Sequence, residues 1–410
     1  MSSVAGPASE PVALSDVEIG RLRADTPGTA SVVHLNNAGA SMSPEPVVEA
    51  VVGYLRREAE IGGYEAHAES ESRIEGVYRS LAQLINSGPD EIALLESATR
   101  AWDMAFYAID VKPGDRILTS RAEYASNAIA ILQTVRRHGV VVEVVPDGPD
   151  GALSTTALES MIDDRVRLIA VNHVPSQNGL VNPVARIGAI ARRAGVLFLL
   201  DACQSLGQLQ VDVTDIGCHL LSGTGRKFLR GPRGTGFLYV DRTILEQLEP
   251  PFLDNHAARW TAPDSYRMRS DARRFETWEA SYAARLGLGV AADYAMTVGL
   301  AAIAARNSAL TGRLRSGLDS ITGVRTHDRG TVKSAITTFT VEGHHPAQVR
   351  DQLRARRVNV SVTTADTALF DMPGRGIDAV VRASPHYFNT EAEVDALLIC
   401  LEDIRKTPAV

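Results

Sequence analysis

One carboxylate stands where a buried strand is expected to end. Asp201 directly follows the apolar run Val196–Leu200, which is typical of a parallel strand covered on both faces. Open α/β sheets bind ligands at the carboxyl ends of their strands. A carboxylate buried there needs a cation or strong donors to stay ionised, and a protonated pyridine nitrogen would serve. Because Asp also caps helices that follow strands, a helix cap is the alternative for Asp201 alone.

A lysine lies nearby in a segment rich in glycine and hydroxyl groups. Lys227 falls within residues 221–237, which read Leu-Ser-Gly-Thr-Gly-Arg-Lys-Phe-Leu-Arg-Gly-Pro-Arg-Gly-Thr-Gly-Phe. A lysine amine becomes suited to Schiff-base chemistry when burial or neighbouring cations lower its pKa, and Arg226, Arg230 and Arg233 are local candidates for that effect. A solvated basic loop is the alternative.

A third candidate segment precedes a helix predicted over residues 101–108. Ser97, Ala98 and Thr99 stand just before it, where free backbone N–H groups and the helix dipole favour a phosphate. An ordinary helix cap is again the alternative.

An α/β fold would position these residues. From about residue 35 to residue 240, short apolar runs alternate with stretches of helical period. Several runs are apolar throughout, as expected of parallel strands between two layers of helices. We therefore predict a doubly wound, mostly parallel sheet. Its predicted strands are 116–119, 140–145, 167–171, 196–200 and 236–240.

The pattern changes near residue 280. Helices predicted over 282–297 and 300–318 lead into a shorter α+β segment with elements at 335–341, 346–356, 358–362, 380–383 and 391–404. A chain of 410 residues exceeds the roughly 100 to 200 residues of one typical domain. We predict an N-terminal arm (1–30), a large domain (31–280) and a small C-terminal domain (281–410).

Composition excludes several classes of protein. The formal charge of −7 and the lack of a long basic stretch argue against a nucleic-acid partner. No apolar run approaches the roughly 20 residues of a membrane helix, and residues 1–11 lack the pattern of a secretion signal. The three cysteines lack paired C-x-x-C spacing, so no metal site is expected. We expect a cytoplasmic protein.

Taken together, these segments resemble the class-V aminotransferase family of fold-type-I pyridoxal-5′-phosphate (PLP) enzymes. The matching motifs run in family order along nearly the whole chain. They are His34–Ser41, Glu96–Thr99, Arg121–Asn127, Asn172–Val174, Asp201–Gln204, Thr224–Lys227, Arg274–Glu276 and Val381–Thr390.

The resemblance implies a role for each candidate cofactor residue. Lys227 would hold PLP as a Schiff base, and Asp201 would pair with the pyridine nitrogen. Tyr124 occupies the position of a histidine that stacks on the cofactor in the desulfurases, and its aromatic face can do the same. Together these three form the expected catalytic set. The remaining predicted cofactor contacts are His173 and Gln204 near the ring, and Ala98, Thr99 and Thr224 at the phosphate.

Substrate contacts are expected from three other residues. By resemblance Arg382 would bind the α-carboxylate of an amino-acid substrate, for which a planar bidentate donor is well suited. Asn36 and Tyr64 complete the expected substrate-binding set. Gly62 and Gly63 would let the backbone approach a ligand that Tyr64 covers, although a helix-ending Gly-Gly with a packed tyrosine is the alternative.

The resemblance also limits which PLP reactions are expected. Cysteine desulfurases use a loop cysteine before the carboxylate-binding arginine, but residues 360–369 contain none, and Cys203 is interpreted as a small packed residue. Residues 57–64, 226–234 and 274–279 are most similar to the hercynylcysteine sulfoxide lyase branch. We therefore expect a C–S β-lyase that converts an S-substituted cysteine, a thioether or sulfoxide, into a thiol or sulfenate with pyruvate and ammonia, in actinobacterial natural-product or ergothioneine-type metabolism.

Three alternatives stay open. They are a decarboxylating oxidative deaminase of an S-conjugated cysteine, an aminotransferase or epimerase, and a catalytically silent binding protein. Family members are dimers, so a homodimer with active sites near the interface is expected. In the desulfurases a Gly-Thr pair reaches the partner's phosphate, whereas Thr277-Trp278-Glu279 stands here.

Overall fold

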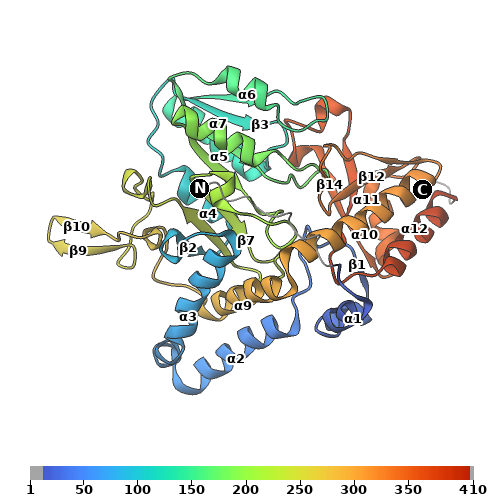
Figure 1. The fold of residues 1–410 in the computed structure, drawn as a ribbon, viewed down its shortest axis with the longest axis horizontal. Helices are drawn as coiled ribbons and strands as arrows, with labels where there is room; N and C mark the ends of the chain where they lie inside the picture. Colours follow the sequence, from blue (N-terminus) through green and yellow to red (C-terminus); the bar gives the residue numbers. More distant parts are fainter. Residues whose placement is uncertain (1–12, 407–410) are drawn as a thin grey trace, which may run out of the picture.

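The computed structural model describes residues 13–406, and residues 1–12 of the predicted N-terminal arm lie outside the described part. A large sheet flanked by helices occupies one side of the molecule, and a smaller sheet with its own helices occupies the other (Figure 1). This is the predicted α/β architecture.

The large sheet has seven strands in the order β2-β8-β7-β6-β5-β3-β4. Strands β3 to β7 run parallel to one another, whereas β8 is antiparallel to both β2 and β7. The sheet is thus mostly parallel as predicted, and the strand predicted over residues 236–240 is its antiparallel member. The bounds are β2 Ile92–Leu95, β3 Arg116–Ser120, β4 Val141–Val145, β5 Val166–Asn172, β6 Leu197–Asp201, β7 Leu220–Thr224 and β8 Gly236–Val240.

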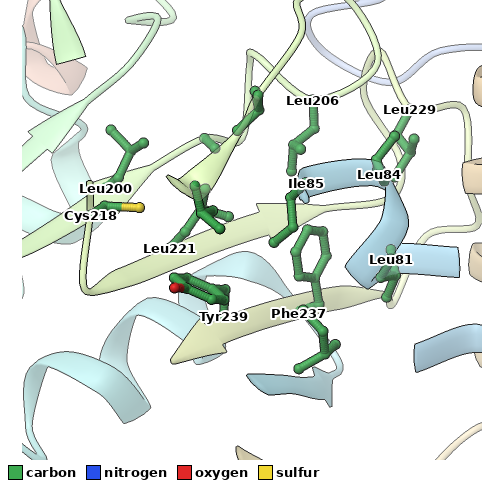
Figure 2. Packing of buried hydrophobic residues seen from close by; sticks show 14 of the residues in the cluster. Leu81, Leu84, Ile85, Leu200, Leu206, Cys218, Leu221, Leu229, Phe237 and Tyr239 are labelled. Atoms are coloured by element: carbon green, nitrogen blue, oxygen red, sulfur yellow. The ribbon is translucent and has the colours of Figure 1, made fainter. Parts of the chain in front are cut away.

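Both faces of this sheet are covered, which explains its uninterrupted apolar strands. Consecutive residues of a strand point to opposite faces, so Leu200 packs in one core and Leu199 in the other. Figure 2 shows the first core, where Leu221 and Phe237 of the sheet meet Ile85 of a covering helix. A run such as Val196–Leu200 thus needs no polar position.

Helices α2, α3, α7 and α9 contribute to the core that contains Leu200, and α4 and α5 contribute to the core that contains Leu199. Helix α9 packs along α2 and α3, so its apolar residues belong to the core of the large sheet (Figure 1). The bounds are α2 Glu45–Ile61, α3 Gly63–Ile85, α4 Ala98–Phe106, α5 Ala125–His138, α6 Thr155–Met161, α7 Val184–Ala194, α8 Val213–Ile216 and α9 Tyr282–Val298.

A four-stranded sheet in the order β11-β12-β15-β14, antiparallel throughout, forms the C-terminal part. The predicted segment 358–362 divides into two strands, because β13 leaves the sheet and pairs with β1 near the N-terminus. The bounds are α1 Asp16–Ala24, β1 Val33–His34, α10 Leu300–Ser320, β11 Val324–Thr326, β12 Thr337–Val341, α11 Pro346–Ala355, β13 Val358–Asn359, β14 Ser361–Thr364, β15 Ala379–Ala383 and α12 Glu391–Lys406. The domain boundaries at residues 30 and 280 stay predictions.

A hairpin of β9 (Ala258–Ala262) and β10 (Ser265–Met268) projects from the large sheet region (Figure 1). Trp260 on this hairpin is 77% exposed. Among the helices within residues 13–406, none alone is long and apolar enough to cross a membrane. The consecutive helices α9 and α10 meet that test only together, with a bend of 78° between them.

Candidate active site

A pocket lies at the carboxyl ends of the parallel strands. Its lining residues follow β2, β3, β5, β6 and β7, and they come together because parallel strands end at one edge of the sheet. The lining residues are Ser97, Ala98, Thr99, Tyr124, Asn172, Val174, Ser176, Asp201, Cys203, Gln204, Thr224, Arg226 and Lys227. All of the predicted cofactor-binding residues except His173 are among them.

Lys227 is the buried amine of this pocket. Burial lowers its pKa, and the guanidinium groups of Arg226 and Arg382 lower it further, although Asp201 has the opposite effect. A neutral lysine amine is a nucleophile and a base. The Lys227 Nζ lies 5.9 Å from the centroid of the Tyr124 ring, so the amine and the aromatic face border the same space.

The loop that carries Lys227 is held by its neighbours. Gly207 has a φ of +83°, and a Cβ there would lie 2.4 Å from the Phe228 carbonyl carbon, so the turn after β6 packs directly on the lysine loop. Arg230 is buried and donates to the Thr26 hydroxyl (2.6 Å) and the Tyr387 hydroxyl (2.7 Å). Arg230 therefore anchors the loop, while Arg226 has the predicted electrostatic effect on Lys227.

Asp201 ends β6 with its carboxylate in the same pocket. Its Oδ1 accepts a hydrogen bond from the Cys203 backbone N–H (2.9 Å), and its Oδ2 accepts one from the Asn127 side chain (3.0 Å). Asp201 is 7% exposed. The two donors hold this buried carboxylate in place, and this arrangement suits a partner with a protonated ring nitrogen.

The predicted phosphate end lies at the start of α4. Ser97 caps the helix by accepting from the Arg100 N–H (3.1 Å), and Ala98 and Thr99 line the pocket beside Thr224. Gly236 of β8 allows this approach, because a Cβ there would lie 2.5 Å from the Ala98 backbone nitrogen. The first helical turn therefore opens directly onto the strand edge.

The two predicted ring contacts, Gln204 and His173, lie in different positions relative to the pocket. Gln204 lines the pocket, donates to the Ala38 carbonyl (3.1 Å) and keeps a buried Oε1 without a protein partner. His173 is buried beside the lining residues Asn172 and Val174, but it does not line the pocket itself. Burial lowers the pKa of His173 to about 4, and its Nδ1 has no partner.

Arg382 belongs to the small sheet and does not line this pocket itself, but it bonds to the lining residue Ser176. It lies on β15, is 7% exposed and donates from Nη1 to the Ser176 carbonyl (3.0 Å), while its Nε has no partner. Burial lowers the pKa of Arg382 to about 10, and Arg226 contributes to that shift. Asn36 forms a bridge to Ser384 of the segment after β15, and its buried Oδ1 also lacks a partner.

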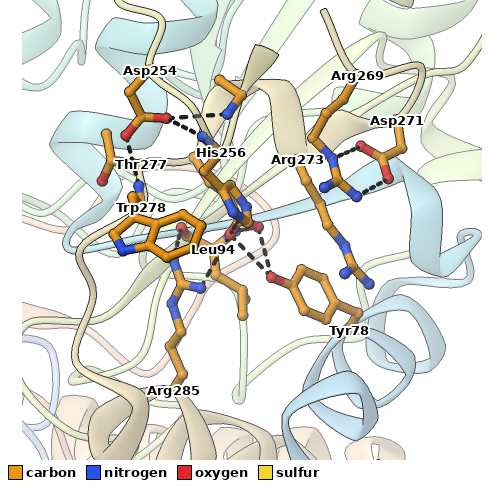
Figure 3. Close-up of polar contacts among 12 residues, drawn as sticks. Tyr78, Leu94, Asp254, His256, Arg269, Asp271, Arg273, Thr277, Trp278 and Arg285 are labelled. Carbon is orange, nitrogen blue, oxygen red and sulfur yellow. Dashed lines mark hydrogen bonds and ion pairs between the residues drawn. The ribbon is translucent and has the colours of Figure 1, made fainter. Parts of the chain in front are cut away.

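Tyr64 lies apart from this pocket. It is 80% exposed near the start of α3 and lines another hollow, together with His67, Trp278 and Tyr282. Figure 3 shows the polar contacts behind that hollow. The buried Glu276 carboxylate accepts from Tyr78 (2.9 Å) and the Leu94 N–H (2.9 Å) and pairs with Arg285 (3.1 Å). Within one chain, Tyr64 is therefore not brought to the substrate side of Lys227.

Several residues of the site were not singled out from the sequence. Asn127 and Asn172 were seen only as parts of longer motifs, and Ser176 gave no signal, because its contribution is a backbone carbonyl. Cys203 was interpreted as a packed residue, yet it lines the pocket, and burial raises the pKa of its thiol.

The fold is that of a fold-type-I enzyme, and the pocket places a buried lysine at the carboxyl ends of its parallel strands. A family profile described as aminotransferase class-V matches residues 33–397, and the chain belongs to that family. The family consists of PLP enzymes, so the predicted cofactor is confirmed.

Named relatives lie among the cysteine desulfurases. A probable cysteine desulfurase of Methanothermobacter thermautotrophicus is 29% identical over 389 residues, which cover 93% of this chain and 97% of that protein. A cysteine desulfurase of Pectobacterium atrosepticum is 28% identical over 405 residues, covering 95% and 98%. The apo cysteine desulfurase from Thermococcus onnurineus NA1 superposes with a TM-score of 0.89 at 27% identity, covering 94% and 98%. The predicted fold class is therefore confirmed.

The residues present fit PLP. Three residues predicted to contact the cofactor or the substrate each have a buried polar atom without a protein partner, namely Gln204 Oε1, Asn36 Oδ1 and Arg382 Nε. Such atoms cost free energy unless a ligand or water satisfies them. The pocket also holds a lysine whose pKa is lowered, a buried carboxylate and a helix start, which match an aldehyde, a pyridine nitrogen and a phosphate respectively.

Proposed function

We propose that this enzyme is a PLP-dependent C–S β-lyase acting on an S-substituted cysteine, with a thiol or sulfenate, pyruvate and ammonia as products. Cysteine desulfurase relatives support C–S chemistry in general. The more specific part of the proposal is that the enzyme is a lyase and not a desulfurase. The positions of the cysteines support this part.

The positions of the three cysteines are the main support for a lyase. Residues 360–369, which include β14, contain no cysteine. Cys218 is fully buried in the large core, and Cys400 lies on α12. Only Cys203 lines the pocket, and burial keeps its thiol protonated by raising the pKa. Because the thiolate is the nucleophile in persulfide formation, the pocket is poorly equipped to accept sulfur.

The residues have separate roles in the proposed reaction. PLP, when bound, supplies an electron sink at the α-carbon. Arg382 holds the substrate α-carboxylate, and Asp201 keeps the proton on the ring nitrogen. Lys227, whose pKa burial lowers, takes the α-proton at Nζ. The Cβ–S bond then breaks, the electron pair leaves with sulfur, and the remaining three-carbon fragment is hydrolysed to pyruvate and ammonia.

A direct assay separates this reaction from its competitors. PLP-loaded enzyme is incubated with S-benzylcysteine or its sulfoxide, and pyruvate, ammonia and released thiol are measured, with Lys227→Ala as the control. We expect pyruvate and ammonia in equal amounts. In a parallel incubation with free cysteine, the formation of alanine and an enzyme-bound persulfide would instead identify a desulfurase. Keto-acid-dependent amino transfer without pyruvate would identify an aminotransferase.

The proposed enzyme is also a homodimer. Three aromatic side chains support this: Tyr64 is 80% exposed, Trp260 is 77% exposed and Trp278 is 51% exposed. Exposed aromatic residues of this size are typical of interfaces. A second copy would cover them and could bring Tyr64 toward the neighbouring active site. Light scattering on the purified protein tests this, and a monomer of 44.0 kDa would contradict it.

A further inference from the structure

A second buried carboxyl group lies behind the site. Glu123 precedes helix α5 and is 3% exposed. Its Oε2 accepts from the Thr119 hydroxyl (2.7 Å), and its Oε1 accepts from the Tyr124 backbone N–H (2.8 Å) and the Asn127 side-chain amide (2.9 Å). Burial raises the pKa of Glu123 to about 7. Glu123 does not line the pocket, and the proposed reaction does not use it.

Asn127 joins this group to Asp201. The Asn127 Nδ2 lies 2.9 Å from Glu123 Oε1 and 3.0 Å from Asp201 Oδ2, with the Asn172 Oδ1 at a longer 3.3 Å. An amide nitrogen has two hydrogens, so the two shorter contacts can use both of them. One amide thus bridges two carboxyl groups that lie on either side of it.

This bridge restricts the Asp201 carboxylate. The Cys203 N–H holds Oδ1 and Asn127 holds Oδ2, so rotation of the carboxylate would break one bond or both. Asn127 cannot turn away without losing its bond to Glu123. Hydrogen bonds to a charged acceptor in a buried site are among the stronger ones in proteins.

We propose that Asn127, anchored by Glu123, is a positioning residue that orients the Asp201 carboxylate toward the cofactor ring nitrogen. The inference rests on the role given to Asp201 in the proposed function. It is independent of which bond the enzyme breaks, because the ring nitrogen is used in every PLP reaction considered above.

The test compares Asp201→Asn, Asn127→Ala, Glu123→Ala and Glu123→Gln. The readouts are the visible absorption of bound PLP, the affinity for PLP, and kcat and KM. Gln133→Ala is the matched control, because Gln133 lies on the same helix and bonds to the Tyr107 hydroxyl (2.7 Å), away from the pocket.

We expect Asn127→Ala to shift the absorption of bound PLP in the same direction as Asp201→Asn. Its kcat should fall by about 10- to 100-fold, the effect of one hydrogen bond to a charged group, with KM nearly unchanged. Glu123→Ala should cause a smaller loss. Glu123→Gln should restore the wild-type spectrum, because its amide oxygen can accept both bonds now made to Oε1. Gln133→Ala should leave spectrum and kcat unchanged.

The outcomes separate the possible failures. A folded Asn127→Ala protein with wild-type spectrum and kcat overturns the inference. A Glu123→Gln protein as defective as Glu123→Ala also overturns it, because charge rather than geometry would then matter. If Asn127→Ala does not fold, the Glu123 pair tests the same contact from its other end. If Asp201→Asn leaves the spectrum unchanged, the role proposed for Asp201 is wrong.

Discussion

Substitution of Arg382 tests whether a residue of the small sheet binds the substrate of the pocket at the edge of the large sheet. Its guanidinium is buried, its Nε has no partner, and among the described residues no carboxylate contributes to its electrostatic environment. A substrate α-carboxylate would therefore be the counterion that this buried cation lacks. Removing one member of a buried ion pair costs about 3 to 5 kcal/mol. Taking the lower figure, because the pocket opens to solvent, Arg382→Ala should raise KM roughly 100-fold.

The effect should fall on KM rather than on kcat. The α-carboxylate is not changed during C–S cleavage, so its contact with Arg382 contributes equally to the bound ground state and to the transition state. Arg382→Lys should lie between wild type and Arg382→Ala, because an ammonium keeps the charge without the bidentate geometry.

A substrate analogue provides the control. The thioether of cysteamine lacks the carboxylate, so wild type and Arg382→Ala should handle it equally poorly. The KM values are obtained from initial rates of thiol release, which both compounds produce. A large fall in kcat with unchanged KM, or an equal penalty on the cysteamine thioether, would refute the assignment of Arg382 to the carboxylate.

Three further predictions concern buried groups in the pocket or directly behind it. Lys227→Ala should lose the covalent link to PLP, so borohydride reduction should no longer leave cofactor on the denatured protein; retained label would refute its role. Cys203→Ser should keep most pyruvate formation, and a loss above about 10-fold would show that the thiol takes part in the chemistry. Glu123 has a folded-state pKa of about 7 against an ordinary 4.5, so its ionisation should destabilise the folded protein by up to about 3 kcal/mol as pH rises through that range. Glu123→Gln should remove this cost, and the gain in Tm of the apo variant over wild type should grow from pH 5 to pH 8; a constant difference would contradict the burial argument.

Local patterns were sufficient for most elements of the fold. The strands at 116–119, 140–145, 167–171 and 196–200 and the helices from 282 and 300 were predicted within a few residues of their observed bounds. Strand β7 (Leu220–Thr224) was not assigned, because it runs into the glycine-rich segment and has little strand signal of its own. Residues 236–240 were predicted as a strand, but periodicity carries no information on strand direction.

In the candidate site, too, local sequence was sufficient to place some residues but not others. Asp201 could be placed because a polar residue after a wholly apolar strand falls at the sheet edge whatever the rest of the chain does. Tyr64, by contrast, was assigned to the substrate from a local Gly-Gly-Tyr pattern, but it is exposed near the start of α3 and lines a different hollow.

The sequence by itself determined which residue types were available at the strand ends and, through the order of its motifs, the family and the cofactor. Only the tertiary structure decided which of those residues meet. It brings Arg382 of β15 to the carbonyl of Ser176, and it joins Glu123 to Asp201 through one amide. It also shows that Arg226 lowers the pKa of Lys227, whereas Arg230 anchors the loop. The physical reason is range: hydrophobic periodicity and strand ends are properties of neighbouring residues, whereas burial, pKa and hydrogen-bond partners depend on contacts between segments far apart in the chain.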